Sequence, residues 1–224
     1  MPSLIDVVSV TKIYRTDGLP VRALHQVDLR IETGQFAVLA GPSGSGKSTL
    51  LHLIGALDQP TEGEITVAGQ NLKNLSRSLL SGFRLKKIGF VFQAYNLIPV
   101  LSALENVEYP LLLQEIEKKE RKERAIELLR RVGLGDQMTK RPGEMSGGQQ
   151  QRVAVSRALA TRPEIVLADE PTANLDSQTG ASLIDLFRDL NQQMGMTFLF
   201  ASHDPMVIER AQRVIRLKDG EVIS

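Results

Sequence analysis

The sequence contains no cysteine. Disulfide bonds, thiolate metal sites and cysteine nucleophiles are therefore excluded, which fits a cytosolic protein without proving one. An excess of charge is also absent, because 27 Lys and Arg stand against 26 Asp and Glu and leave a net charge of +1. No overall field favours nucleic acid or an anionic membrane surface, although a local basic patch is compatible with these counts.

Long hydrophobic runs are missing as well. No apolar stretch approaches the roughly 20 residues that a helix needs to span a bilayer. The N-terminal segment, Met1 to Asp6, lacks the basic start and apolar stretch of a secretion signal. We therefore expect a soluble chain, and any role at a membrane must come through a partner.

What the chain does contain is ordinary for a folded protein. Its 224 residues are 42% hydrophobic and 24% charged. This length is enough for one globular domain with a substantial core and room for an inserted subdomain. The composition argues against a disordered chain.

The first third of the sequence is predicted to form strands. Val27, Leu29 and Ile31 alternate with polar residues, the period of a half-buried strand. The continuous apolar run 36–40 is typical of a strand covered on both faces. Residues 65–68 and 88–92 are further strand candidates.

The middle, residues 97–159, is predicted to be mostly helical. Acidic residues precede basic ones at helical spacing between Gln114 and Arg131, which favours a solvated helix face without chemistry of its own. The expected pairs are Glu115/Lys119, Glu117/Arg121 and Glu120/Arg124, and the expected apolar stripe is Ala125, Leu128, Leu129 and Val132.

The last third returns to strands, with a long helix over residues 177–194 between two of them. The expected strands are residues 165–168, 197–201 and 214–217, and a turn at 218–220 leads into a final short strand. The pattern as a whole indicates an α/β core interrupted by a helical subdomain.

One motif carries a definite chemistry. It begins at the end of the apolar run 36–40, fits the pattern G-x-x-x-x-G-K-[ST], and leads into the apolar residues of a helix. Backbone N–H groups of such a loop and the helix N-terminus bind phosphates, while Lys47 reaches the β and γ phosphates and Ser48 ligates magnesium. The predicted nucleotide-binding residues are Gly41, Pro42, Ser43, Gly44, Ser45, Gly46, Lys47, Ser48 and Thr49.

Two acids end the buried strand 165–168. Asp169 is expected to hold magnesium, directly or through water, and Glu170 to act as the general base for an attacking water. Taken alone, the pair would fit a solvated acidic turn equally well. His203 follows another strand toward the same sheet edge, where we expect a γ-phosphate contact rather than a structural histidine.

A second glycine-rich helix start lies in the predicted helical insert. Ser146 is a natural N-cap, and Gly147, Gly148 and Gln149 open an amphipathic helix over residues 150–161. One nucleotide does not need two anion sites from one molecule. Two copies facing head to tail would solve this, each closing its helix start on the other's γ phosphate.

Along the chain, the motifs occur in the order typical of the ABC-type ATPases: the loop at Gly41, Gln93, the 146–149 motif, Asp169-Glu170, residues 173–176 and His203. The sequence resembles this family over essentially its whole length. The resemblance implies a P-loop NTPase core at residues 1–93 and 161–224, with an N-terminal antiparallel β subdomain and a helical subdomain inserted at 94–160. It also implies that Tyr14 stacks on adenine rather than serving only the core. Gln93 is implied to ligate magnesium and position water, and Asp176 to touch the opposite site across the dimer.

Two residues depart from the family pattern. Met145 replaces the usual leucine, a swap of similar volume that we expect to be tolerated. Ala173-Asn174 replaces the commoner serine-alanine, and no catalytic residue is put in doubt by it. Because Glu170 is present, the site should hydrolyse ATP rather than only bind it.

The finer resemblance is to the lipoprotein-release and macrolide-export ATPases. It rests on the segments 57–63, 88–93, 96–99 and 105–107. The implied partners are a second copy and separate permease subunits with a large extracytoplasmic domain, with a periplasmic adaptor as a further candidate. The permease is expected to be a separate polypeptide, because the chain stops shortly after Gly220. The chain would then sit on the cytoplasmic face of the inner membrane, held there by its permease.

The expected function is ATP hydrolysis, with Mg²⁺, that drives export or extraction of a lipoprotein, peptide or hydrophobic compound. Residues 94–104 are either the docking surface for a permease helix or ordinary subdomain core. An ATPase that only signals across the membrane, as in a division complex, is compatible with the same motifs. A soluble ATPase acting on nucleic acid or the ribosome is less well supported, because there is one phosphate loop and a short insert. A P-loop kinase would leave the 146–149 motif and His203 without roles.

Overall fold

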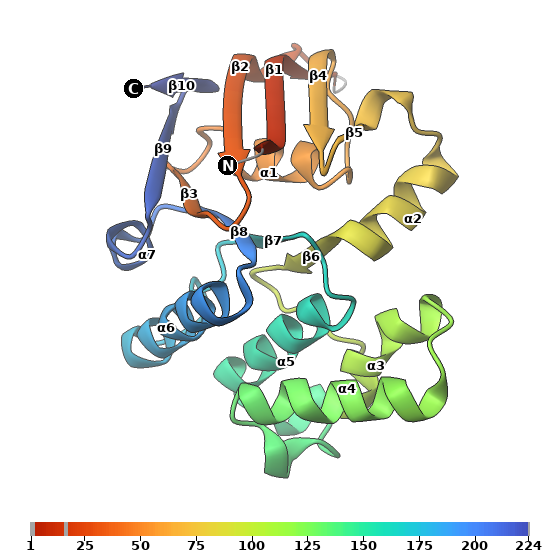
Figure 1. Ribbon diagram of the computed structural model, residues 1–224. Coiled ribbons are helices and arrows are strands. Elements are labelled where there is room, and N and C mark those ends of the chain that lie inside the picture. The colour runs from red at the N-terminus through yellow and green to blue at the C-terminus, as the bar shows by residue number, and fades with distance from the viewer. Residues whose placement is uncertain (1–2, 16–17, 224) are drawn as a thin grey trace.

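The computed structural model describes residues 3–15 and 18–223. Met1 and Pro2, the start of the segment without a secretion signal, lie outside these ranges. No helix in the described residues is long and apolar enough to cross a membrane. The elements form two sheets and a group of helices (Figure 1).

The first sheet is antiparallel and carries the N-terminal part of the chain. Its strand order is β2-β1-β4-β5. In β2 the predicted alternation is confirmed, since Val27, Leu29 and Ile31 are buried and the residues between them are exposed. The strands are β1 (Ser3–Tyr14), β2 (Val21–Glu32), β4 (Glu62–Val67) and β5 (Gln70–Asn71).

The second sheet has six strands in the order β10-β9-β3-β8-β7-β6. All neighbours in it are parallel except β9 and β10, which form an antiparallel pair. The strands are β3 (Phe36–Ala40), β6 (Ile88–Val91), β7 (Ile165–Asp169), β8 (Thr197–Ser202), β9 (Arg213–Lys218) and β10 (Glu221–Ile223). Every residue of β3 is buried, as its continuous apolar run predicts.

Seven α-helices connect the strands in the described part of the chain. They are α1 (Lys47–Ile54), α2 (Arg77–Lys87), α3 (Ala103–Leu113), α4 (Lys118–Arg131), α5 (Gly147–Ala160), α6 (Ser177–Met194) and α7 (Pro205–Glu209). The helices α3, α4 and α5 gather on one side of the molecule in Figure 1. Their position supports the predicted helical insert, while its limits at residues 94 and 160 stay a prediction.

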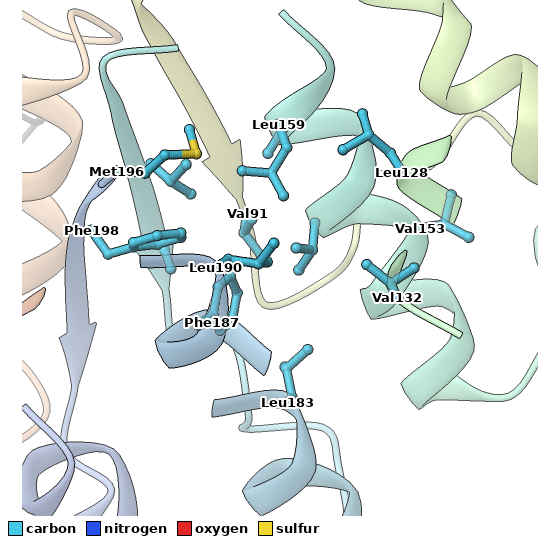
Figure 2. Close-up of a cluster of buried hydrophobic side chains, with 14 of the residues drawn as sticks. Val91, Leu128, Val132, Val153, Leu159, Leu183, Phe187, Leu190, Met196 and Phe198 are labelled. Atoms are coloured by element: carbon cyan, nitrogen blue, oxygen red, sulfur yellow. The ribbon is translucent and has the colours of Figure 1, made fainter. Parts of the chain in front are cut away.

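A continuous apolar core joins the helical group to the parallel sheet. Figure 2 shows Val91 of β6 and Phe198 of β8 near Phe187 of α6, with α5 between these residues and the side chains of α4. The predicted stripe of α4 is confirmed, because all four of its residues are buried. The helical group is therefore packed on the parallel sheet rather than joined to it only by linkers.

Two local predictions were wrong. The chain between the predicted strands 65–68 and 88–92 is not all strand, because it contains α2, capped by the Ser76 side chain. Leu80 of this helix is buried, and Phe83, one turn along, packs partly buried against the core.

The charge pairs before α4 are also corrected. Glu117 is the N-cap of α4, and its carboxylate accepts from the N–H groups of Lys119 and Glu120. A helical pairing of Glu117 with Arg121 is thereby ruled out, as is one of Glu115, which lies before the helix. Arg121 instead pairs with Glu108 of α3, and only Glu120 and Arg124 form the expected pair, at 2.6 Å.

Candidate functional site

The predicted catalytic and phosphate-binding residues meet at one edge of the parallel sheet. In the register of the sheet, Ala40 pairs with Ser202, Ala201 with Asp169, and Ala168 with Val91. The strands are parallel, so the segments that follow them leave the sheet at the same edge, where ligands of open α/β sheets bind. The segments that follow these strands are the phosphate loop 41–46, His203, Glu170 and Gln93.

The phosphate loop depends on glycine at two places. A Cβ at Gly41 would lie 2.2 Å from the carbonyl oxygen of Leu217, so only glycine fits there. Gly46 has φ 98°, in the left-handed region, and turns the chain into α1. The ammonium of Lys47 is buried and donates to the carbonyls of Gly41 and Pro42, at 2.8 and 2.9 Å. Its charge is thus held against the loop.

Ser48 and Asp169 come together, although 121 positions separate them. The Ser48 hydroxyl donates to Asp169 Oδ1 at 2.8 Å. The other carboxylate oxygen faces His52 Nε2 at 3.4 Å. His52, one turn along α1 from Ser48, was not predicted as part of the site. Its position in α1, facing the end of β7, could be read only from the packing of the two elements.

Glu170 and His203 form a second pair. The carboxylate oxygen Oε1 of Glu170 lies 2.7 Å from His203 Nδ1, and a carboxylate only accepts, so the ring donates. The second oxygen accepts from the buried hydroxyl of Ser202 at 3.1 Å. Glu170 has φ 43°, a left-handed conformation that costs about 1–3 kcal/mol and is concentrated at functional sites. Ser202, next to His203, is a further site residue that the sequence did not reveal.

Gln93 lies two residues after β6, and its backbone is fixed by other predicted motifs. Its carbonyl accepts from Asn174 Nδ2 at 3.0 Å. The carbonyls of Tyr95 and Asn96, two and three residues further on, accept from the guanidinium of Arg157 in α5, at 2.9 and 2.5 Å. The segment after Gln93 is therefore attached to α5, the helix that the 146–149 motif opens.

That motif lies apart from the phosphate loop. α5 is in the lower half of Figure 1, and α1 is in the upper half. Ser146 and Gln149 form a reciprocal capping box, with bonds of 3.3 and 2.9 Å. Both glycines are closely packed: a Cβ at Gly147 would lie 2.7 Å from the Tyr95 hydroxyl and one at Gly148 2.5 Å from the Thr179 side chain, so either would displace a neighbouring side chain. The helix begins at Gly147 rather than at 150.

Asp176 caps α6 and is exposed. Its carboxylate accepts from the N–H groups of Gln178 and Thr179. Hydrogen bonding to Thr179, above all, holds the pKa of Asp176 below its usual range. The residue therefore remains an anion at the surface.

Tyr14 lies at the end of β1, in the antiparallel sheet. Its side chain is 37% exposed, and its hydroxyl donates to Asp58 Oδ2 at 3.1 Å. The ammonium of Lys12 lies over the ring, 4.8 Å from its centroid. Burial, followed by the Asp58 carboxylate, raises the pKa of the Tyr14 phenol, while a hydrogen bond with Thr49 acts in the opposite direction.

The predicted metal set agrees with the chemistry of magnesium. Mg²⁺ prefers oxygen ligands and is commonly held by one or two carboxylates together with substrate phosphates. Ser48 and Asp169 present converging oxygens, and Gln93 follows the neighbouring strand β6. Among residues 3–15 and 18–223, no three His, Cys, Asp or Glu side chains gather as a metal site, so a protein-only cage is not what this edge provides.

The ABC transporter family model matches residues 24–173. The chain belongs to the ABC transporter family. Among curated proteins, it is 45% identical over 221 residues to the lipoprotein-releasing system ATP-binding protein LolD of Syntrophus aciditrophicus, covering 99% of both chains. It is also 47% identical over 223 residues to the macrolide export ATP-binding/permease protein MacB of Hyphomonas neptunium, of which it spans 34%.

A solved structure of this ABC family is also similar. It is the ATP-binding cassette MJ0796, a protein of Methanocaldococcus jannaschii, in a dimeric post-hydrolysis state bound to ADP and Pi. The TM-score is 0.91 at 46% identity, and the match covers 98% of this chain and 97% of that one. The expected fold is confirmed, and this ABC protein is an ATP-binding ATPase.

Proposed function

We propose that this chain is the ATP-hydrolysing subunit of an ABC membrane complex. Two copies close on two ATP molecules and drive a separate permease, which exports or extracts a lipoprotein, peptide or hydrophobic compound. The complex lies at the inner membrane with this subunit on the cytoplasmic face. The observation that carries the proposal is the meeting of the phosphate loop, the Ser48–Asp169 pair and the Glu170–His203 pair at one sheet edge.

The phosphates bind at the start of α1. N–H groups of the loop 41–46 and the ammonium of Lys47 hold the phosphate oxygens. Ser48, Asp169 and Gln93 would hold Mg²⁺, which supplies positive charge to the β and γ phosphate oxygens when bound. The ordered contact between Ser48 and Asp169 means that two of these ligands are already aligned.

Glu170 orients and deprotonates the attacking water. Ser202 donates to one carboxylate oxygen and His203 to the other, so the side chain is fixed in rotation. A doubly protonated His203 would also donate from Nε2 to a γ-phosphate oxygen while it keeps its bond to Glu170. The two hydrogen bonds from Ser202 and His203 therefore fix the Glu170 carboxylate before the substrate binds.

The site is completed by a second copy. LolD and MacB relatives, and the dimeric structure of MJ0796, support a pair of cassettes. Ser146 to Gln149 of one copy would close on the γ phosphate bound to the other, and Asp176 would lie near the same interface. Tyr14 would stack on the adenine base. Within the described residues, the side-chain hydrogen bonds of the 146–149 motif are those of its own capping box, which fits a helix start that faces a second copy.

Replacement of Glu170 tests the catalytic assignment. Glu170→Gln should lower ATP turnover by at least about 100-fold, because general-base catalysis typically contributes 10²–10⁴-fold. It should also trap an ATP-bound dimer, which gel filtration with and without ATP would detect. Glu164→Gln is the matched control, since Glu164 lies at the other end of β7 and pairs with Lys87.

Equal activity of the two variants would show that Glu170 is not the base. Loss of turnover in Glu170→Gln without an ATP-dependent dimer would contradict the two-copy site. The Glu164 variant should behave as the unmodified chain in both assays. Its folding can be compared by thermal denaturation.

A groove beside the Gln93 segment is the proposed permease contact. It has a volume of about 370 Å³ and lies between β6 and α3, with Phe90, Phe92, Ile98, Tyr109 and Pro110 in its lining. Residues 94–104 divide between the two predicted roles. Leu97 and Leu104 pack against the core, while Val100 is 70% exposed. An apolar groove suits the apolar face of a cytoplasmic permease helix.

Co-purification in gentle detergent tests this contact. A tagged Glu170→Gln chain with ATP should recover a permease with a large extracytoplasmic domain, identified by mass spectrometry. Adding Tyr109→Asp should abolish this recovery, whereas Leu113→Asp, on the exposed part of α3 outside the groove, should not. Recovery with ribosomes or nucleic acid and no membrane protein would overturn the transport function.

A further inference from the structure

A nucleotide bound as proposed would touch two different sheets. Its phosphates lie at the loop that follows β3, in the parallel sheet. Its base lies at Tyr14, in the antiparallel sheet. The distance between the Tyr14 ring and the phosphate loop must match the length of the nucleotide. Contacts near Tyr14 must therefore fix the antiparallel sheet relative to the parallel one.

Asp58 connects the end of α1 directly to β1. It lies four residues after the end of α1, the helix that the phosphate loop opens. One of its carboxylate oxygens accepts from the Tyr14 hydroxyl at 3.1 Å and from the Lys12 ammonium at 2.7 Å. A single side chain at the end of the phosphate helix thus contacts two residues of β1.

The backbone around Asp58 is attached to the same strand. Thr61 accepts from the Ile13 N–H through its hydroxyl, at 3.0 Å, and donates its own N–H to the Thr11 carbonyl, at 2.9 Å. Lys12 also donates to the carbonyl of Gln59, at 2.7 Å. Segment 57–63 is therefore fixed along the end of β1, and Asp58 is its contact with the tyrosine ring.

Lys12 restricts which face of the ring is available. Its ammonium lies over one face, 4.8 Å from the ring centroid, and its side chain is only 12% exposed. A stacking base must then use the other face. Because Asp58 holds both the phenol and the ammonium, it determines the orientation of the ring and the side from which it is reached.

We infer that Asp58 is a positioning residue for nucleotide binding, which fixes the Tyr14 ring at the distance and orientation that a purine base needs when its phosphates occupy the loop. This inference rests on the proposed function, in which Tyr14 is the base platform. It adds a residue to the site that neither the phosphate loop nor the acidic strand end identifies. Asp58 does not touch the nucleotide itself.

The charge of Asp58 is stable in this environment. Burial acts to raise its pKa, but hydrogen bonds from Lys12, the Gln59 N–H and Tyr14, with the charge of Lys12, outweigh burial and lower it. The carboxylate therefore accepts from both partners at neutral pH. In Asp58→Asn, the uncharged amide oxygen would still accept from the Tyr14 hydroxyl, but the contact with the Lys12 ammonium would be weaker.

Calorimetry with two ligands separates positioning from general damage. The ligands are ADP, which has a base, and inorganic tripolyphosphate, which has none. In the full chain, Asp58→Ala should weaken ADP binding by about 3- to 10-fold, the effect of one or two hydrogen bonds, and leave tripolyphosphate binding within about twofold. Asp58→Asn should recover part of the loss. Asp6→Asn, which removes an ion pair of the same 2.7 Å length elsewhere on β1, should change neither.

The Tyr14→Ala background shows whether Asp58 affects ADP binding through the Tyr14 ring. Tyr14→Ala alone should weaken ADP binding by at least about fivefold, since stacking of a base on an aromatic ring contributes about 1–3 kcal/mol. Adding Asp58→Ala to Tyr14→Ala should then cause no further loss. A further loss, or equal weakening of tripolyphosphate by Asp58→Ala, would make Asp58 a structural residue and overturn the inference.

Failure of the proposed function would look different. If Tyr14→Ala bound ADP as tightly as the unmodified chain, Tyr14 would not be the platform, and its proposed role and the positioning role of Asp58 would both be wrong. If Tyr14→Ala weakened ADP and Asp58→Ala did not, only the positioning role would be wrong. Tyrosine absorbance gives an independent reading, because the chain has three tyrosines and no tryptophan. In Asp58→Asn one tyrosine should ionise at lower pH, since a cause that raises the Tyr14 pKa has been removed.

Discussion

At the scale of single residues, two glycines of the antiparallel sheet both have a left-handed backbone conformation but lie in different surroundings. Gly63 has φ 85° and Gly69 has φ 74°. A Cβ at Gly63 would lie 2.4 Å from the Ser9 carbonyl oxygen and 2.6 Å from that of Val8, whereas nothing lies within 4 Å at Gly69. Alanine at Gly69 is therefore disfavoured only by the left-handed conformation. Alanine at Gly63 must in addition displace the backbone of β1.

We expect Gly69→Ala to lower the free energy of unfolding by about 1–2 kcal/mol, the cost of a left-handed alanine. Gly63→Ala should cost at least about 2 kcal/mol more, because the backbone of β1 has to move. Urea denaturation of the two variants measures the difference. Equal losses would mean that β1 yields to the extra methyl group without cost.

The single residues also show where a sequence stops being informative. Lys47, Ser48, Asp169 and Glu170 could be predicted because each stands inside a motif with a fixed local geometry. Ser202, His52 and Asp58 carry no such pattern, and their contacts join residues 32, 117 and 44 positions apart. Such contacts arise from the packing of strands and helices, which one sequence does not specify.

At the scale of elements, α5 and the segment after β6 form one unit. Arg157 of α5 is partly buried and donates to the carbonyls of Tyr95 and Asn96, both in left-handed conformations with φ 60° and 49°. Burial lowers the pKa of this guanidinium. The helix opened by the 146–149 motif therefore holds the backbone that follows Gln93.

Arg157→Met should lower the free energy of unfolding by about 1–3 kcal/mol, because two carbonyls lose a charged donor. Hydrogen exchange should rise in residues 93–98, which lose their attachment to α5. Arg131→Met is the matched control, since it removes an exposed pair with Glu127 worth about 0.5 kcal/mol. Equal exchange in the two variants would show that the segment is held by other contacts.

Elements with a clear periodicity were predicted well, and polar ones were not. The helix at 177–194 and the strand at 36–40 have the predicted limits, because each has a continuous pattern bounded by caps or turns. α2 was not predicted, because its core-facing side is limited to Leu80, which is buried, and Phe83, which is partly buried, among mostly polar residues. The start of α4 was placed too early, since Glu117 serves as its cap and the charge spacing alone does not show where a helix begins.

At the scale of the whole molecule, the proposed dimer divides each ATP site between two chains. The phosphate loop, Ser48, Asp169 and Glu170 come from one copy, and Ser146 to Gln149 come from the other. A substitution in the phosphate loop of one copy and a substitution in its 146–149 motif therefore damage different ATP sites of the dimer. Two inactive chains should be able to form one intact site when they pair with each other.

We expect Lys47→Ala and Ser146→Arg chains to be inactive alone and to regain ATPase activity when mixed before ATP is added. In a mixed pair, one site carries both defects and the other carries neither. Random pairing makes half of the dimers mixed, so the mixture should reach about a quarter of normal turnover if the sites act independently.

A mixture of Lys47→Ala with Glu170→Gln is the matched control. Both substitutions lie in the same half of the site, so every pairing leaves each site with a defect, and no activity should return. The comparison depends only on which half carries each residue. If the two mixtures gave equal activity, Ser146 would not belong to the opposite site, and the arrangement of the dimer would have to be different.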